Sequence, residues 1–425
     1  MIRGIKGVKD ILPPEIPRWQ TIEGEARRLS ELYGFEEIRV PIFEVTELFA
    51  RSIGASTDIV EKEMYTFEDR DGKSLTLRPE GTAGVVRAFI EHNLAGAAGT
   101  QKFYYLGAMF RHERPQAGRL RQFHQFGVES FGSPHALADV EVIALLWRFL
   151  AGLGLPGLIL ELNSLGDAAD RPAYIALLVS FLKERESRLC ENCRRRMTSN
   201  PLRVLDCKIP SCRDATQDAP KLTDHLSPNA RQHFDTVLTG LGDLGIPYVI
   251  NPRLVRGLDY YTQTTFEVTT GALGAQNAVG AGGRYDGLVE ALGGPKTAAV
   301  GFAVGLERVA LLLSESAVTP PMSMVYVAAF GHHGLPAGMR ILDDLRGRGL
   351  RAETDYRAST LRSHLKQADR LGALLVVIVG DDEAAKGECV IRNMRSKRQE
   401  QVPTDRLGSL IATRTHSLTD DAFSS

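Results

Sequence analysis

The sequence predicts an α+β fold that is interrupted by a helical insertion and followed by a separate α/β domain. Two β-rich blocks flank a segment, 170–247, that has helical patterns and few strand signals. A helical block between two β-rich blocks is typical of an insertion into one domain. Further along, strands alternate with helices over about 100 residues, which is typical of an α/β domain.

The predicted domain boundaries follow these changes in composition. We expect the first domain to span 1–318, with 170–247 as its mainly helical insertion. A Pro- and Ser-containing stretch predicts a linker at 319–325. The second domain is expected to span 326–420.

Local signals predict the elements of the first domain. A helix is expected over 15–34, ending at Gly34, and a strand broken by Pro41 follows it. Two β-rich segments joined by a short loop containing Pro and Gly predict a hairpin with a long basic tip. The other expected elements are a strand–turn–helix unit over 73–92, a helix over 136–151, strand structure over 248–270, a glycine-rich turn over 271–283 and a helix over 301–313.

The second domain is predicted from four patterned segments. Apolar runs predict strands, and amphipathic runs predict helices. The expected strands are 324–330 and 373–380, and the expected helices are 337–349 and 360–372.

Charge and hydropathy exclude several classes of protein. The 51 Lys and Arg residues balance 52 Asp and Glu residues, so the chain does not coat nucleic acid by bulk charge. The longest apolar stretch, 371–380, has about half the length that a membrane-spanning helix needs, and a buried strand explains it better. We find no signal peptide, and five cysteines do not make a disulfide scaffold. The sequence predicts a cytoplasmic protein without membrane association.

The predicted hairpin tip concentrates positive charge. The stretch RHERPQAGRLRQFHQ, 111–125, holds four arginines and two histidines around one acidic residue, Glu113. Arginine binds phosphate through paired hydrogen bonds, so this cluster suits a nucleoside triphosphate. Phe123, Phe126 and Tyr105 are interleaved with the charges and could stack on a base. A solvated surface loop is the alternative.

Two further stretches carry candidate groups. Tyr260 and Tyr261 follow Arg256 at the edge of a predicted strand, where alternation lets only one of the two side chains line a given pocket. Packing in the core is the ordinary interpretation for both tyrosines. Arg308 lies on an apolar helix beside Glu307, where snorkelling or an ion pair is its ordinary role.

Four cysteines of the insertion have metal-ligand spacing. Cys190 and Cys193 form a CxxC pair, and Cys207 and Cys212 form a second close pair. Such pairs are typical of structural zinc sites. The second pair has four intervening residues rather than two, and the sequence alone favours reduced free thiols over zinc.

Six segments in fixed order resemble the histidyl-tRNA synthetases, a family of class II aminoacyl-tRNA synthetases. They are GFEEIRVPIFE, LTLRPEGT, FRHERPQAGRLRQFHQFGVE, LVRGLDYYTQTTFEV, AGGRYDGL and VGFAVGLERV. The resemblance covers nearly the whole chain. It implies a class II catalytic domain, built on an antiparallel sheet flanked by helices, and a C-terminal α/β anticodon-binding domain.

The resemblance implies a two-step reaction. Histidine and ATP form histidyl-adenylate and pyrophosphate, and the histidyl group then moves to the 3′ end of tRNA(His). The first step joins two anions, so positive charge and alignment are required. Arg111 and Arg256 are the implied catalytic residues at the α-phosphate. The implied ATP-binding residues are Arg111, Glu113, Arg119, Phe123 and Arg308, with Mg²⁺ bridging the outer phosphates.

The resemblance also implies a histidine site. Its residues are Glu80, Thr82, Arg111, Gln125, Glu129, Arg256, Tyr260, Tyr261 and Tyr285. Glu80, Thr82 and Gln125 are implied to hold the substrate ammonium. Glu129 and Tyr261 are implied to pair the two imidazole nitrogens, which excludes amino acids that lack them.

The remaining implications concern partners. Arg114, Gln116 and Arg121 are candidates for the tRNA acceptor end, whereas His112 and His124 have no assigned role. The GFEEIRVPIFE segment implies a homodimer. The alternative function is that of a catalytically inactive, histidine-binding regulatory paralogue of ATP phosphoribosyltransferase, which by resemblance lacks the anticodon-binding domain. A class II synthetase for another amino acid is a third possibility, and RGLDYY argues against it.

Overall fold

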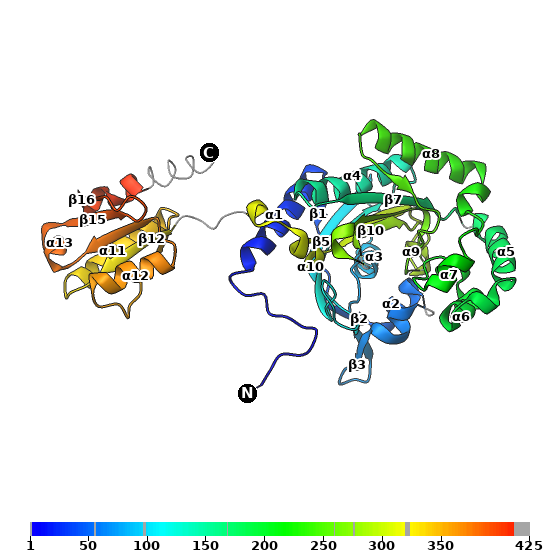
Figure 1. Ribbon diagram of the computed structural model, residues 1–425, viewed down its shortest axis with the longest axis horizontal. Helices are drawn as coiled ribbons and strands as arrows, with labels where there is room; N and C mark the ends of the chain where they lie inside the picture. The colour runs from blue at the N-terminus through cyan, green and yellow to red at the C-terminus, as the bar shows by residue number, and fades with distance from the viewer. Residues whose placement is uncertain are drawn as a thin grey trace. The chain divides into compact units, whose positions relative to one another are not determined.

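The computed structural model describes residues 2–54, 57–96, 99–167, 169–258, 260–274, 277–318 and 324–411 (Figure 1). The chain divides into two compact units, Met1–Thr319 and Pro320–Ser425, and each is described by itself. Of the predicted linker, 319–323 lies outside the described residues, as does 412–420 of the predicted second domain. Met324 and Val325, which the sequence assigned to the linker, are buried and begin strand β12 (Met324–Ala329).

The large unit is built on an eight-stranded sheet with the order β1-β5-β6-β11-β10-β9-β7-β8. The central pairings, from β5 to β7, are antiparallel, and only the outer pairs β1–β5 and β7–β8 are parallel. The strands are β1 (Glu36–Glu37), β5 (Gln101–Phe110), β6 (Gln122–Phe131), β7 (Leu158–Ser164), β8 (Val249–Ile250), β9 (Thr262–Thr270), β10 (Ala278–Arg284) and β11 (Ala299–Gly305).

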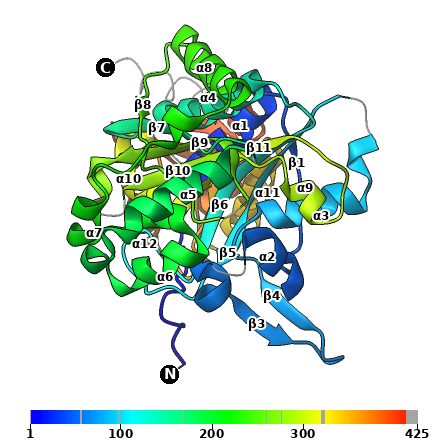
Figure 2. The same cartoon turned by 90° about the vertical axis from the view of Figure 1, so that its right-hand side faces the viewer.

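Helices cover one face of this sheet in layers. Helix α4 (Ala136–Gly152) packs on β6, β9, β10 and β11, and α8 (Pro228–Asp243) lies against α4 on the side away from the sheet (Figure 1, Figure 2). Helices α1 (Ile16–Leu32) and α10 (Leu306–Leu312) complete this layer. Ten of the residues of α4 are buried, so this apolar helix is the centre of the larger hydrophobic core.

Smaller elements lie beside strands β5 and β6 of the sheet. Helices α2 (Thr46–Ile53) and α3 (Thr82–Glu91) pack together, and a three-stranded sheet has the order β2-β4-β3. Its strands are β2 (Phe43–Val45), β3 (Tyr65–Glu68) and β4 (Ser74–Leu77). A second hydrophobic core joins α3 to β5 and to the insertion.

The insertion is helical. All residues of 170–247 are described, and none of them forms a strand. Its helices are α5 (Asp170–Lys183), α6 (Glu191–Ser199), α7 (Pro210–Ala215) and α8. Ser227 caps α8 by accepting a hydrogen bond from the Ala230 amide, and Pro228 occupies the first helical turn. The Asp170 carboxylate accepts from the Ser227 amide at 2.9 Å, which joins the start of α5 to the start of α8.

Two predictions for the second β-rich block were wrong. Residues 278–283 belong to β10 (Ala278–Arg284) rather than to a turn, and 301–305 belong to β11 (Ala299–Gly305) rather than to the start of a helix. A Cβ added to Gly282 would lie 2.1 Å from the carbonyl oxygen of Gly301. Glycine here permits close approach of two strands, a role that composition does not distinguish from that of a turn.

The small unit contains a five-stranded sheet with the order β13-β12-β14-β15-β16. The β12–β13 and β12–β14 pairs are parallel, and the remaining pairs are antiparallel. Hydrophobic clusters lie on both faces of the sheet. The elements besides β12 are α11 (Gly334–Gly347), β13 (Arg351–Glu353), α12 (Leu361–Arg370), β14 (Leu375–Val379), α13 (Asp381–Lys386), β15 (Glu388–Asn393) and β16 (Gln399–Pro403). In either unit, no helix of the described ranges is both long enough and apolar enough to cross a membrane.

Candidate active site

The large unit contains a cavity of about 380 Å³ that is lined by the tip of the β5–β6 hairpin and by one face of β6. Its walls come from β6, β10, β11, the start of α3, the hairpin tip and the insertion. The cavity is lined by all thirteen residues for which the sequence predicts contact with histidine or ATP. They are Glu80, Thr82, Arg111, Glu113, Arg119, Phe123, Gln125, Glu129, Arg256, Tyr260, Tyr261, Tyr285 and Arg308.

Strand alternation in β6 decides which hairpin residues reach the cavity. Phe123, Gln125 and Glu129 are at alternate positions and line it. Phe126 points the other way, is fully buried and packs against aromatic rings of the core. Tyr105 is also buried and does not line the cavity. Of the three aromatic residues considered for base stacking, only Phe123 is therefore placed to do so.

The inner end of the cavity is a network of buried acidic and hydroxyl groups. Glu80 caps α3, because its carboxylate accepts from the Thr82 amide at 2.6 Å and the Ala83 amide at 2.9 Å. The Thr82 hydroxyl donates to Oε1 of Glu129 at 2.6 Å, and the Tyr285 hydroxyl donates to Oε2. Burial raises the pKa of Glu129 to about 8, although both hydrogen bonds act in the opposite direction.

The two adjacent tyrosines both line the cavity, contrary to the alternation argument. β9 begins at Thr262, so Tyr260 and Tyr261 precede the strand and do not alternate across it. Their ring centroids lie 4.7 Å apart, and Tyr260 also contacts the ring of Tyr285 at 5.6 Å. Three tyrosine rings thus form one aromatic wall.

The hairpin tip gives the cavity its positive charge. Nε of Arg111 donates to the carbonyl of Pro79 at 2.8 Å, and its guanidinium lies 5.3 Å from the Phe123 ring centroid. The Glu113 carboxylate is 2.9 Å from the guanidinium of Arg119 and 3.8 Å from that of Arg111. Arg308 enters from α10 and donates to the carbonyl of Ala278.

Arg256 enters from the segment between β8 and β9. One of its terminal nitrogens lies 3.3 Å from a carboxylate oxygen of Glu267, and its guanidinium is 5.8 Å from the Tyr261 ring centroid. Nε of Arg256 and Oε1 of Gln125 are buried and have no hydrogen-bond partner among the described residues. Buried polar atoms without partners are costly, so these two atoms are suited to a bound ligand.

The cavity also has lining residues that the sequence did not single out. Glu267 pairs with Arg256, and Arg203, Asp206 and Lys208 come from the insertion. Nη1 of Arg203 donates to the Arg256 carbonyl at 3.2 Å. No local motif marks these residues, because the fold alone brings the insertion to the cavity wall.

The two unassigned histidines have structural partners. The His124 amide lies 2.9 Å from both carboxylate oxygens of Glu307, and its ring Nδ1 lies 3.0 Å from one of them. This contact joins β6 to α10 beside the cavity. His112 is exposed, and its amide donates to the Glu63 carbonyl at 2.7 Å.

The candidates for tRNA contact lie outside this cavity. Arg114 and Gln116 are exposed on the hairpin tip. Arg121 is partly buried, and its guanidinium donates to the carbonyls of Glu113 and Lys6, both at 3.4 Å. These three residues therefore lie on the same hairpin tip as the nucleotide-binding candidates but do not line the cavity.

The four cysteines of the insertion form a separate cluster. Their sulfur atoms all lie within 4.8 Å of one another, and none of the cysteines lines the cavity. Cys207 nevertheless lies between two cavity-lining residues, Asp206 and Lys208.

Comparison with known proteins agrees with the geometry of the cavity. Residues 7–309 match the histidyl-tRNA synthetase family, and 324–414 match an anticodon-binding domain. The histidine–tRNA ligase of Desulfatibacillum aliphaticivorans is 53% identical over 97% of this chain and 99% of its own, and that of Trichlorobacter lovleyi is 52% identical over 94% and 96%. The crystal structure of apo histidyl-tRNA synthetase from S. aureus, 37% identical, superposes with a TM-score of 0.81 over 96% of this chain and 99% of that one. The chain belongs to the histidyl-tRNA synthetase family.

Proposed function

We propose that the cavity joins histidine to ATP and that the chain then transfers the histidyl group to tRNA(His). The convergence of Arg111 and Arg256 on one cavity carries this proposal, because the two arginines come from distant segments and line the same cavity. The full-length similarity to histidine–tRNA ligases supports it.

The first step is attack of the histidine carboxylate on the α-phosphorus of ATP. A new O–P bond forms, the bond to the bridging oxygen breaks, and pyrophosphate leaves with its electron pair. Arg111 and Arg256 would hold the carboxylate and the α-phosphate together and stabilise the charge that builds up between them. Their guanidinium groups remain protonated throughout, so neither serves as an acid or a base.

The outer phosphates and the base would occupy the hairpin side of the cavity. Arg119 and Arg308 are assigned to the outer phosphates, Phe123 to stacking on adenine and Glu113 to its amino group. In the unliganded site Glu113 pairs with Arg119. Nucleotide binding would therefore exchange this ion pair for contacts with ATP.

Mg²⁺ is implied by the family, and the residues present fit it. In nucleotide sites Mg²⁺ keeps several waters and takes one or two carboxylates besides phosphate oxygens. Glu267 offers such a carboxylate on the cavity wall. The ion would neutralise charge on the outer phosphates.

Histidine specificity would come from the inner end of the cavity. Glu129 would accept a hydrogen bond from one imidazole nitrogen, and the Tyr261 hydroxyl would pair with the other. The ammonium group would bind among Glu80, Thr82 and Gln125, whose unpaired buried oxygen is an available acceptor. An amino acid without two ring nitrogens would leave these buried groups unpaired, at a cost of about 1–3 kcal/mol for each group.

The second step requires the tRNA acceptor end near the same cavity. The terminal hydroxyl of the tRNA attacks the histidyl carbonyl, and AMP leaves. Arg114, Gln116 and Arg121 are our candidates for guiding this end, because they lie on the hairpin tip close in sequence to residues that line the cavity. The small unit matches an anticodon-binding domain and would contact the tRNA elsewhere.

A homodimer in the cytoplasm is the assembly that we propose. The segment around β1 and β2 exposes Ile42 and Phe43, and the ring of Phe43 contacts that of the exposed Phe67. Exposed apolar groups of this kind are suited to a subunit interface. Sedimentation equilibrium of the native chain and of Phe43→Asp tests the dimer, and a monomeric native chain would contradict it.

Exchange of pyrophosphate into ATP tests the activation step. With a panel of amino acids, only histidine should stimulate exchange, and tRNA(His) should then accept labelled histidine. Histidine binding without exchange would instead support the regulatory paralogue, which the comparisons do not favour over the ligases.

A further inference from the structure

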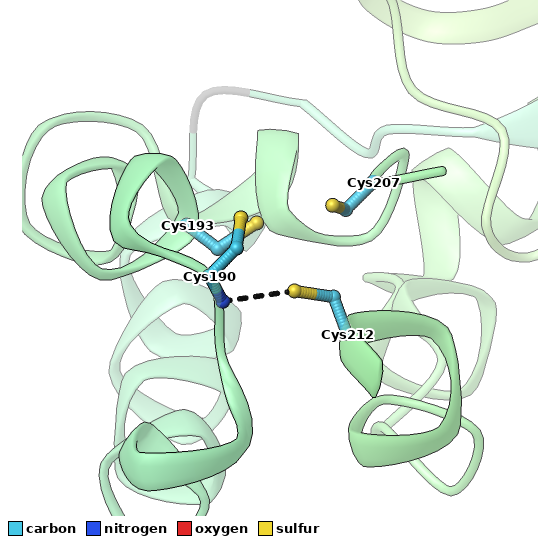
Figure 3. A group of neighbouring side chains, drawn as sticks. All are labelled: Cys190, Cys193, Cys207 and Cys212. Atoms are coloured by element: carbon cyan, nitrogen blue, oxygen red, sulfur yellow. Dashed lines mark hydrogen bonds between the residues drawn. The ribbon is translucent and has the colours of Figure 1, made fainter. Parts of the chain in front are cut away.

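The four cysteines of the insertion come from three separate pieces of backbone. Cys190 precedes the first residue of α6 and Cys193 lies in its first turn, whereas Cys207 lies in the turn before α7 and Cys212 lies in α7. Figure 3 shows the four side chains pointing toward a common centre. Their sulfur atoms all lie within 4.8 Å of one another.

This spacing is close to that of a metal tetrathiolate. Zinc is bound tetrahedrally by sulfur at about 2.3 Å, which places the sulfur atoms about 3.8 Å apart. Small side-chain rotations would bring the observed cluster to this geometry. The Cys190 amide also donates to Sγ of Cys212 at 3.1 Å, a contact that stabilises negative charge on a ligating sulfur (Figure 3).

Two other interpretations fit the cluster less well. Packing of buried thiols in an apolar core explains the burial of Cys193 and Cys212 but not the convergence of two half-buried thiols on the same point. Disulfides would pair sulfurs at about 2 Å, and all five cysteines are free thiols in this structure.

We propose that Cys190, Cys193, Cys207 and Cys212 bind one structural Zn²⁺. Four protein ligands fill the tetrahedral shell and leave no position for substrate, so the ion has no part in the chemistry. This assignment reverses the preference for free thiols that the spacing alone gave. The convergence of the four sulfur atoms is stronger evidence than the unusual sequence spacing of Cys207 and Cys212.

The zinc site would stabilise the part of the insertion that forms one wall of the active-site cavity. Arg203 and Asp206, which lie between the two cysteine pairs, and Lys208, which lies between Cys207 and Cys212, are on that wall. Arg253 donates to the carbonyl of Leu205 at 3.1 Å and to that of Thr216 at 2.8 Å, on either side of Cys207 and Cys212.

These contacts continue to the segment that carries a proposed catalytic residue. Arg253 lies three residues before Arg256, whose carbonyl accepts from Arg203 at 3.2 Å. Loss of the metal should therefore loosen both the insertion and the Arg256 segment. This consequence, unlike the metal site itself, rests on the proposed function.

Metal analysis of the full chain tests the site directly. The protein is purified under reducing conditions without chelators and is then measured by plasma mass spectrometry. We expect about one zinc per chain, loss of most of it in Cys207→Ser, and no change in Cys389→Ala. Cys389 is the matched control because it is the remaining cysteine and lies in β15 of the small unit. Zinc well below one per chain, even after incubation with zinc salt, would overturn the proposal.

A second measurement needs no cysteine variant and so does not depend on variant folding. The native chain is stripped with a chelator and loaded with Co²⁺. A tetrathiolate site gives intense visible bands and sulfur-to-metal charge-transfer absorption. A weak spectrum typical of octahedral oxygen ligands would overturn the assignment of the four sulfurs.

Pyrophosphate exchange separates the metal site from its effect on the cavity. We expect Cys207→Ser to raise the KM for ATP or lower kcat several-fold relative to Cys389→Ala. Loss of zinc with unchanged pyrophosphate exchange would overturn the proposed role of the metal in stabilising the cavity wall. A chain that binds one zinc but shows no histidine-dependent exchange would contradict the proposed function and leave the zinc site supported.

Discussion

The Thr82 hydroxyl lies 2.6 Å from Oε1 of Glu129, so the first residue of α3 and a residue of β6 share a hydrogen bond at the inner end of the cavity. The Glu129 side chain is only 1% exposed. Burial raises its pKa from the ordinary value of 4.5 to about 8. The unliganded protein thus holds a proton at Glu129 that the unfolded chain releases at a lower pH.

This difference makes stability depend on pH. Between 4.5 and about 8 the folded state binds more protons at Glu129 than the unfolded state, so the contribution of this group to stability falls as pH rises. Glu129→Gln removes the titration but keeps the shape. We expect the melting temperature of the native chain to fall relative to that of Glu129→Gln across this range, measured without histidine. A difference between the two that stays constant with pH would contradict the raised pKa.

Histidine recognition gives the next prediction. Glu129→Ala and Tyr261→Phe should weaken histidine binding by about tenfold or more, which corresponds to about 1.4 kcal/mol. Each change leaves one imidazole nitrogen without its proposed partner. Calorimetric titration should show nearly unchanged ATP affinity, because neither residue is assigned to the nucleotide. A loss of ATP affinity as large as that of histidine would instead indicate a collapsed cavity.

A buried glycine permits Glu129 to occupy its position. A Cβ at Gly301 would lie 2.0 Å from Oε2 of Glu129 and 2.4 Å from the carbonyl of Val128. Gly301→Ala should therefore abolish measurable histidine binding and cost about 1–3 kcal/mol of stability. Gly305→Ala is the matched control, because a Cβ added at the end of the same strand meets nothing within 4 Å. Equal effects of the two variants on the histidine Kd would contradict this steric argument.

Removal of the Arg256 side chain should slow the formation of histidyl-adenylate more than it weakens the binding of histidine and ATP. Arg256→Ala takes away a positive group that we place at the α-phosphate, and such losses typically cost about 10²–10³-fold in kcat. Glu267→Gln should have a smaller effect, because it keeps Arg256 itself and removes the carboxylate that orients it and that is also our candidate Mg²⁺ ligand. Single-turnover formation of histidyl-adenylate measures both. A native rate in Arg256→Ala would remove Arg256 from the proposed mechanism.

The sequence predicted the β5–β6 hairpin, the helices α1 and α4 and the helical insertion correctly. Alternation and turn residues gave the β5–β6 hairpin, and helical periodicity gave α1, α4 and the insertion. These signals are local, so the sequence contains them in full. The site residues came from the resemblance, and the cavity brings all thirteen together.

The failures have a common physical cause. β10 and β11 were predicted as turn and helix because their glycines were interpreted without knowledge of the strands that approach them. Tyr260 and Tyr261 were placed on a strand that begins only at Thr262. The partner of His124 is Glu307, which lies 183 residues away in the chain. Contacts of this kind depend on tertiary structure, which local propensity does not encode.

A buried ion pair also escaped the sequence analysis. Arg284 and Asp139 are both fully buried, and the guanidinium lies 2.5 Å from the carboxylate. Asp139 also accepts from the Thr264 hydroxyl at 2.8 Å and lies 2.7 Å from Nε2 of His233. One carboxylate therefore joins α4 to β9, β10 and α8, and its partner Arg284 directly precedes Tyr285, which lines the cavity.

Breaking this pair should destabilise the large unit strongly. Asp139→Asn removes the buried counter-ion of Arg284 and leaves it with the partly exposed Asp286 carboxylate, 3.1 Å from its Nη1. Loss of one partner of a buried pair typically costs about 3–5 kcal/mol. Glu25→Gln is the control, because its ion pair with Arg28 is exposed and should contribute at most about 1 kcal/mol. The chain has two tryptophans, at 19 and 147, and both lie in the large unit, so urea unfolding followed by tryptophan fluorescence reports on that unit alone. Similar small losses in the two variants would mean that His233 and Thr264, rather than Arg284, hold Asp139 in place.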